Sequence, residues 1–211
     1  VLGAIGSAAG AAKVAGFNRE MTEHTLSLAA VGAGATRAVR GTTAKHLYCG
    51  RAAELGVVSA IAAKQGATGP VDVFEDRLGL GQLLNDGIFD PRELEALGEE
   101  YGIINPGMDI KKYPVCYASH ATADAVKEIM VVEGLEARDV ASITCTVPPI
   151  VASNLTYSSP QTAAEAQFSL HFAVASIVLH GDITLKHLKT KVLSSAPIKR
   201  LMAGIIVKVG D

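Results

Sequence analysis

Apolar positions in the first half of the chain recur at helical spacing. Residues 1–16 are mostly small and apolar and end in a glycine, which is typical of a helix followed by its stop residue. Asn18 is suited to cap a second helix over residues 19–31, and apolar residues three and four apart predict another over 51–65, before Gly66. This half of the chain therefore predicts a mainly α-helical module.

Glycine and proline mark the breaks between these helices. Residues 32–41 contain three glycines and predict a loop or a broken helix. The order Asp90, Pro91 and Glu93 is typical of an N-cap, a first helical position and a capping box, so it predicts a helix that ends near Gly102. No convincing strand alternation occurs up to this point.

The pattern changes after residues 106–107, Pro-Gly, and we place a boundary near residue 108. Alternating β-branched residues at 140–147 predict a strand, and Thr162 and Glu165 form a second capping box that opens a long apolar helix to His180. Further helices are predicted at 121–133, 184–188 and 197–203, and a strand at 204–209. The chain therefore predicts a helical module in residues 1–108, followed by an α+β module in residues 109–211.

The composition narrows the classes of partner. The 211 residues carry 19 basic and 21 acidic side chains, a net charge of −2, which gives no reason to expect nucleic acid or an anionic membrane as a partner. No stretch reaches the ~18 consecutive apolar residues of a membrane helix. The three cysteines form no C-x-x-C pair and are a poor disulfide framework, so we expect a cytoplasmic protein.

Two kinds of motif could suggest other chemistry. The segments GAG at 32–34 and GLG at 79–81 follow no predicted strand and complete no nucleotide-binding motif, so we interpret them as loop glycines. No pair among the six histidines has H-x-x-x-H spacing, and His46 with Cys49 makes only half of a zinc site. We therefore expect no metal.

Basic residues near predicted helix starts are the better candidates for a site. Lys45 is predicted on a loop just before the helix at 51–65, where its ammonium could meet an anion that docks on the helix N-terminus. Lys111 and Lys112 precede a Tyr-Pro turn, and their side chains diverge if the backbone is extended, so at most one faces a site. His120 precedes a helix start. The alternatives are solvated loop lysines and a histidine that only caps a helix.

Three segments taken together resemble the MmgE/PrpD family. Residues 45–56, KHLYCGRAAELG, are similar to its K-x-L-H-x-G-x-A-A-x-x-G stretch, and GATGP at 66–70 is similar to its G-x-T-G-P. KKYPVC at 111–116, with His120 and the Asp-Ala pair at 124–125, is similar to K-x-Y-P-x-x followed by H and D-A. PQTAAEAQFSL at 160–170 is similar to P-x-T-x-x-E-A-x-F-S.

The resemblance implies a large helical domain and a smaller α+β lid, with the active site between them, in a homodimer. Known members are 2-methylcitrate dehydratase of propionate metabolism, cis-aconitate decarboxylase and iminodisuccinate epimerase. They act on small polycarboxylates without a metal or organic cofactor. The resemblance thus implies a lyase, a dehydratase of the 2-methylcitrate kind. The alternatives are a dicarboxylate epimerase and a non-catalytic fragment or binding module.

The resemblance also implies the site residues. Lys45 and Lys111 match the family's two active-site lysines, His120 matches a histidine at the edge of the pocket, and Tyr157 is similar to a family tyrosine. Removing a proton next to a carboxylate adds negative charge to that carboxylate, which an ammonium stabilises. An imidazole or a carboxylate takes the proton.

Two positions depart from the family pattern. Tyr48 replaces the histidine of K-x-L-H, and Cys116 stands where the decarboxylases carry an active-site histidine, which argues against cis-aconitate decarboxylation. The family's aspartate and two principal histidines are expected before residue 1, and its C-terminal helical return after residue 211. We therefore expect this chain to be an internal part of the enzyme and to be inactive alone.

Overall fold

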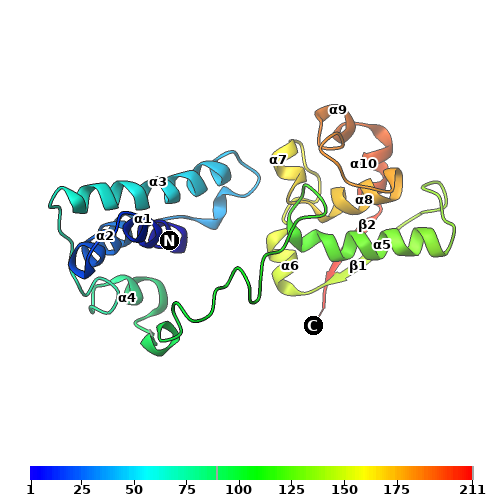
Figure 1. Ribbon diagram of the computed structural model, residues 1–211. Coiled ribbons are helices and arrows are strands. Elements are labelled where there is room, and N and C mark those ends of the chain that lie inside the picture. The colour runs from blue at the N-terminus through cyan, green and yellow to red at the C-terminus, as the bar shows by residue number, and fades with distance from the viewer. Residues whose placement is uncertain (89, 211) are drawn as a thin grey trace. The chain divides into compact units, whose positions relative to one another are not determined.

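The computed structural model describes residues 1–88 and 90–210, and it divides the chain into two compact units (Figure 1). The first unit consists of Val1–Ala38 and Ala44–Met108, and the second of Val39–Thr43 and Asp109–Asp211. The segment Val39–Thr43 thus packs with the second unit although it precedes most of the first in sequence. The predicted fold class, a helical module followed by an α+β module, is confirmed.

The first unit is built on three helices, α1 (Leu2–Val14), α2 (Arg19–Gly32) and α3 (Ala44–Lys64). Small residues let these helices pack closely: a Cβ atom added at Gly56 of α3 would collide with the backbone nitrogen of Ala8 in α1. The predicted cap is confirmed, because the Asn18 side chain accepts a hydrogen bond from the Met21 amide at 2.9 Å.

Two predictions about the first unit are wrong. Helix α3 begins at Ala44, so Lys45 lies in its first turn and not on a loop; the helix continues through Gly50, which costs only about 1 kcal/mol relative to alanine. Within the described part of residues 90–102, the predicted helix is only the 3-10 turn η2 (Pro91–Leu94). Asp90 does cap it, but the Glu93 side chain of the predicted capping box lies outside the described residues. Leu94 and Leu97 are exposed, so burial does not extend this turn into a helix.

Two further short helical segments follow α2 and α3, respectively. The segment predicted as a loop or broken helix holds the 3-10 turn η1 (Arg37–Val39), and α4 (Leu80–Asn85) follows Gly79. A Cβ atom at Gly79 would lie too close to the Val73 carbonyl oxygen, so this glycine permits a close backbone approach. It opens a helix of six residues and completes no nucleotide-binding loop.

The second unit combines helices with a two-stranded parallel sheet. Strand β1 (Ile143–Val147) pairs with β2 (Ile205–Val209), with Ile143 opposite Ile205 and Val147 opposite Val209. Both strands were predicted. The helices of the unit are η3 (Tyr117–Ser119), α5 (His120–Val132), α6 (Pro149–Asn154), α7 (Ala163–Ala166), α8 (Leu170–His180), α9 (Thr190–Leu193) and α10 (Ala196–Ala203).

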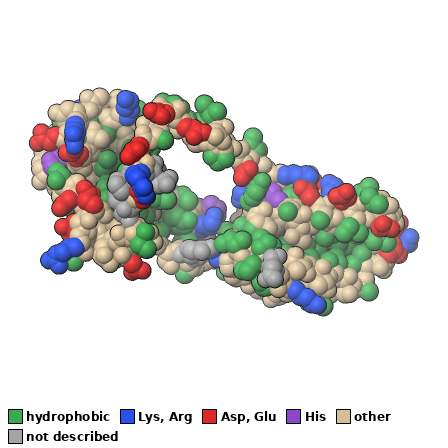
Figure 2. Space-filling model, turned by 90° about the horizontal axis from the view of Figure 1, so that it is seen from below, with side chains coloured by type: hydrophobic (Ala, Val, Ile, Leu, Met, Phe, Trp, Pro, Cys, Tyr) green, Lys and Arg blue, Asp and Glu red, His purple; other side chains and the backbone are tan. Residues whose placement is uncertain are grey.

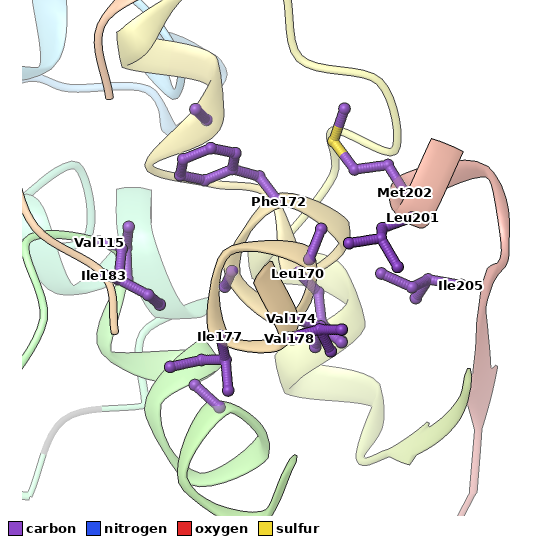
Figure 3. Close-up of a cluster of buried hydrophobic side chains, with 14 of the residues drawn as sticks. Val115, Leu170, Phe172, Val174, Ile177, Val178, Ile183, Leu201, Met202 and Ile205 are labelled. Carbon is purple, nitrogen blue, oxygen red and sulfur yellow. The ribbon is translucent and has the colours of Figure 1, made fainter. Parts of the chain in front are cut away.

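Helix α8 is the centre of the second unit. Leu170, Phe172, Val174, Ile177 and Val178 are all buried, and they pack among side chains from the rest of the unit (Figure 3). Because α8 is surrounded, buried apolar residues occur on all sides of it, interrupted by a few polar residues such as Ser176.

The long helix predicted to run from the Thr162 capping box to His180 is instead two helices. Thr162 caps α7 by accepting from the Glu165 amide at 3.2 Å, and the Ser169 hydroxyl caps α8 by accepting from the Phe172 amide at 3.0 Å. The second cap starts a new helix, which the sequence analysis missed. The helix predicted at 184–188 is only a turn, in which His187 Nδ1 accepts from the Thr184 amide at 3.1 Å.

Large apolar side chains also lie on the surface of both units (Figure 2). On α5, Ile129 is 55% and Val132 71% exposed. Among the described residues, no helix is both long and apolar enough to span a membrane.

Candidate functional site

Asp124, on the first turns of α5, connects two residues of the KKYP segment. Its Oδ1 accepts hydrogen bonds from Lys112 Nζ and from the Tyr113 hydroxyl, each at 2.6 Å. The bond from Lys112 and then that from Tyr113 hold the pKa of Asp124 below its usual range, and the bond to Asp124 raises the pKa of Lys112. Lys112 is therefore paired, whereas Lys111 is exposed and has no hydrogen bond or ion pair within the described residues.

His120 is the first residue of α5 and is only 6% exposed. The rings of His120 and Tyr113 are arranged edge to face with 5.2 Å between their centroids, and the Tyr117 ring lies 5.0 Å away on a tilted plane. Its Nε2 is buried without a hydrogen-bond partner in the described structure. Such an atom costs free energy unless a ligand or water satisfies it, which makes His120 a candidate ligand-binding group rather than a plain cap. The Ser119 hydroxyl does not cap α5 either, since it donates to the Cys116 carbonyl at 2.8 Å.

Cys116 is half-buried at the start of η3. Its amide donates to the Gln167 carbonyl at 2.7 Å, which joins this turn to the segment between α7 and α8. This bond ties the backbone at Cys116 to a segment about fifty residues later in the chain.

Tyr157 lies between α6 and α7, and its hydroxyl donates to the Arg40 carbonyl at 3.0 Å. The Arg40 guanidinium in turn donates to the Ser153 carbonyl at 2.5 Å and to Asn154 Oδ1 at 2.9 Å. These bonds hold the segment Val39–Thr43 on the second unit. The Tyr157 hydroxyl donates a hydrogen bond to the Arg40 carbonyl, and its oxygen still has lone pairs that can accept a hydrogen bond from another group.

Lys45 belongs to the first unit and is half-buried in the first turn of α3. No acidic residue lies in that turn. The N-terminus of a helix carries partial positive charge, so a lysine there adds to a positive potential that favours an anion. Lys111, His120 and Tyr157 all belong to the second unit.

The remaining histidines were compared with the other residues that could bind a metal ion. Within the described part of the chain, no group of three or more His, Cys, Asp or Glu residues is placed to hold a metal ion. His180 and His187 stack at 4.3 Å between ring centroids, and burial, with a smaller contribution from His187, lowers the pKa of His180. Burial also lowers the pKa of His171 on α8, whose Nδ1 has no partner among the described residues.

Sequence reasoning quoted Asp124 only as part of the D-A motif and gave no role in the site to it, to Tyr117 or to Arg40. For Asp124 a signal was present, because it lies four residues after His120 and therefore on the same helix face. Arg40 acts on residues more than a hundred positions away, and no local pattern marks it.

Comparison with known proteins identifies the family to which this chain belongs. The family model for the MmgE/PrpD N-terminal domain matches residues 1–91, and the family model for the MmgE/PrpD C-terminal domain matches residues 113–211. The chain belongs to the MmgE/PrpD family.

Two curated relatives are similar along nearly the whole chain. Cis-aconitate decarboxylase from Homo sapiens is 26% identical over 212 residues, and that from Mus musculus is 25% identical over 212 residues. Each alignment covers 97% of this chain but 43% of the relative, so the chain spans less than half of the length of these proteins.

Proposed function

We propose that this chain is part of a lyase that removes a proton next to a carboxylate of a small polycarboxylate and expels water. The reaction is a dehydration of the 2-methylcitrate kind and uses neither a metal nor an organic cofactor. The observation that carries the proposal is His120, whose buried Nε2 has no partner among the described residues and lies just after the KKYP lysines in sequence. Membership of the MmgE/PrpD family supports it.

Each candidate residue has a part in this chemistry. Lys111, unpaired within the described structure, and Lys45, in the first turn of α3, bind carboxylates of the substrate and stabilise the charge that develops when the proton leaves. His120 transfers a proton through Nε2. Tyr157 accepts a hydrogen bond from the substrate through its oxygen, because its O–H already donates to the Arg40 carbonyl.

Decarboxylation is the second candidate, because the curated relatives are named cis-aconitate decarboxylases. Cys116 disfavours it, because the resemblance places an active-site histidine of the decarboxylases at this position. A thiol is only a weak hydrogen-bond donor and acceptor and lacks the two ring nitrogens with which an imidazole takes up and passes on a proton. Epimerisation of a dicarboxylate uses the same α-proton step and is the third candidate.

The test is an assay of the complete gene product against methylcitrate, cis-aconitate and an iminodisuccinate. Formation of a new double bond from methylcitrate, followed by ultraviolet absorbance, supports dehydration. Release of CO₂ from cis-aconitate supports the second candidate instead. Absence of turnover with all three acids contradicts the proposal and favours a binding module.

Two further expectations rest on the family. The complete protein acts as a cytoplasmic homodimer, which light scattering during size-exclusion chromatography tests. The 211-residue chain alone is inactive, because the resemblance assigns the principal histidines and the aspartate to parts of the family sequence that it does not match. Turnover of any tricarboxylate by the purified chain above background contradicts this expectation.

A further inference from the structure

One oxygen of the Asp124 carboxylate binds both Lys112 and the tyrosine that packs against His120, the candidate proton carrier. Oδ1 of Asp124 accepts from Lys112 and from Tyr113, both at 2.6 Å, and the rings of Tyr113 and His120 are arranged edge to face. Asp124 thus fixes one residue beside Lys111 in sequence and another that packs against His120.

We propose that Asp124 is a positioning residue that withdraws Lys112 from the substrate, so that Lys111 alone of the adjacent pair binds the substrate carboxylate. This inference rests on the proposed function. It adds to that function a reason why one of two chemically identical neighbours is used, and it gives a role to an acidic residue that does not itself contact the substrate.

The contacts of Lys112 support withdrawal. Its ammonium is bound to Asp124 and lies 5.2 Å from the centroid of the Tyr113 ring, so a carboxylate and an aromatic face hold it together. Lys111 is exposed and has neither kind of contact within the described residues. The backbone bends over residues 112–115, so the side chains of Lys112 and Tyr113 both reach Oδ1 of Asp124 instead of alternating as the sequence predicted for an extended segment, whereas Lys111 stays outside this arrangement.

A free second ammonium would harm the reaction even though it would strengthen binding. A substrate with several carboxylates could then bind in two registers, of which only one brings its α-carbon to the proton acceptor. Misplacement of reacting groups by about 1 Å can cost on the order of a hundredfold in rate. The ion pair that holds Lys112 on Asp124 is therefore expected to raise kcat more than it changes the affinity for the substrate.

The Tyr113 bond extends the same role to His120. Tyr113 is only 1% exposed, and the bond from its hydroxyl to Asp124 adds to the core packing that holds the ring in place. Because that ring packs against the His120 imidazole, the carboxylate that sequesters Lys112 also steadies the proton carrier.

The first experiment measures lysine reactivity and needs no catalytic activity. The 211-residue chain is treated with a trace of acetic anhydride, and acetylation at each lysine is quantified by mass spectrometry. Only the neutral amine reacts, so we expect Lys111 to react at least threefold faster than the paired Lys112. In Asp124→Asn the two should react within twofold of each other. Equal reactivity in the unmodified chain, or no effect of Asp124→Asn, overturns the inference, and the first of these comparisons does not require the variant to fold.

The second experiment separates positioning from a structural role in the complete gene product. We expect Asp124→Asn to lower kcat about tenfold with KM changed less than threefold, and Lys112→Ala to leave both within twofold. The double variant Asp124→Asn/Lys112→Ala should recover at least threefold of the lost kcat, since the competing ammonium is gone. Turnover without this recovery overturns the role of Asp124 alone. Absence of turnover in the unmodified protein with every acid overturns the proposed function and this role together.

Discussion

The hydroxyl of Tyr157 donates a hydrogen bond at 3.0 Å to the backbone carbonyl of Arg40, 117 residues earlier in the chain. The next residue, Gly41, has φ +73°, and a Cβ atom there would collide with the Tyr157 hydroxyl. Glycine is required at this position for two reasons, the left-handed backbone and the contact with the phenol ring.

Gly41→Ala should therefore lower the free energy of unfolding of the second unit by about 2 kcal/mol, which combines the cost of the backbone conformation with that of displacing Tyr157. Urea denaturation followed by circular dichroism measures the change. Gly34→Ala is the control, because Gly34 has no positive φ and open space around its Cβ position. Equal effects of the two substitutions would contradict the explanation.

Ser169→Ala should cost about 1 kcal/mol. Ser169 is buried, and its hydroxyl accepts from the Phe172 amide at the start of α8, so the alanine variant leaves that amide without its cap. The matched control is Ser158→Ala, since Ser158 is exposed and has no hydrogen bond within the described part of the chain; it should change stability by less than about 0.5 kcal/mol. Thermal unfolding of the two variants side by side checks the difference.

The sequence predicted the elements that depend on local signals. Asn18 caps the helix expected of it, Thr162 does cap a helix although a shorter one than expected, and both strands form in segments rich in β-branched residues. The break at Ser169 was missed because an apolar run is compatible with one long helix or with two, and only packing around α8 decides between them.

The candidate site likewise contains positions that local sequence signals predict and contacts that they do not predict. The positions of Lys111 and His120 relative to a helix start were readable, because both lie close to the α5 boundary in sequence. The contacts of Tyr157 with Arg40 and of Asp124 with Lys112 were not, since they depend on which of many exposed or half-buried polar groups the fold brings together. A hydrogen bond between distant segments leaves no periodic trace in a sequence.

Acid should destabilise the second unit through His171. Burial lowers the pKa of His171 in the folded state, although a hydrogen bond with the Ile205 backbone opposes part of this change. A histidine with a depressed folded pKa contributes stability above its unfolded value, about 6.5, and loses it as the pH falls toward the folded value, because the unfolded chain binds the proton first.

We therefore expect the free energy of unfolding to decrease between pH 7 and pH 5, and to decrease less in His171→Gln, which retains a polar side chain but does not titrate. Urea titrations at pH 7, 6 and 5 measure both slopes. An identical dependence on pH in the two proteins would show that other groups cause it.

Lys45 and Lys111 should both matter for catalysis, and Lys111 should matter little for stability. In the complete gene product, Lys45→Ala and Lys111→Ala should each lower kcat/KM by tenfold or more, because a charge-assisted hydrogen bond to a carboxylate contributes roughly 1.5–3 kcal/mol and 1.4 kcal/mol is one decade. Lys111 is exposed, so its replacement should change the free energy of unfolding by less than about 0.5 kcal/mol. Lys112→Ala is the matched control, since the ammonium of Lys112 is already held by Asp124 at 2.6 Å. If Lys112→Ala proves as damaging as Lys111→Ala, the wrong lysine has been assigned to the substrate. If neither Lys45→Ala nor Lys111→Ala reduces turnover, the role implied by the family does not extend to this protein.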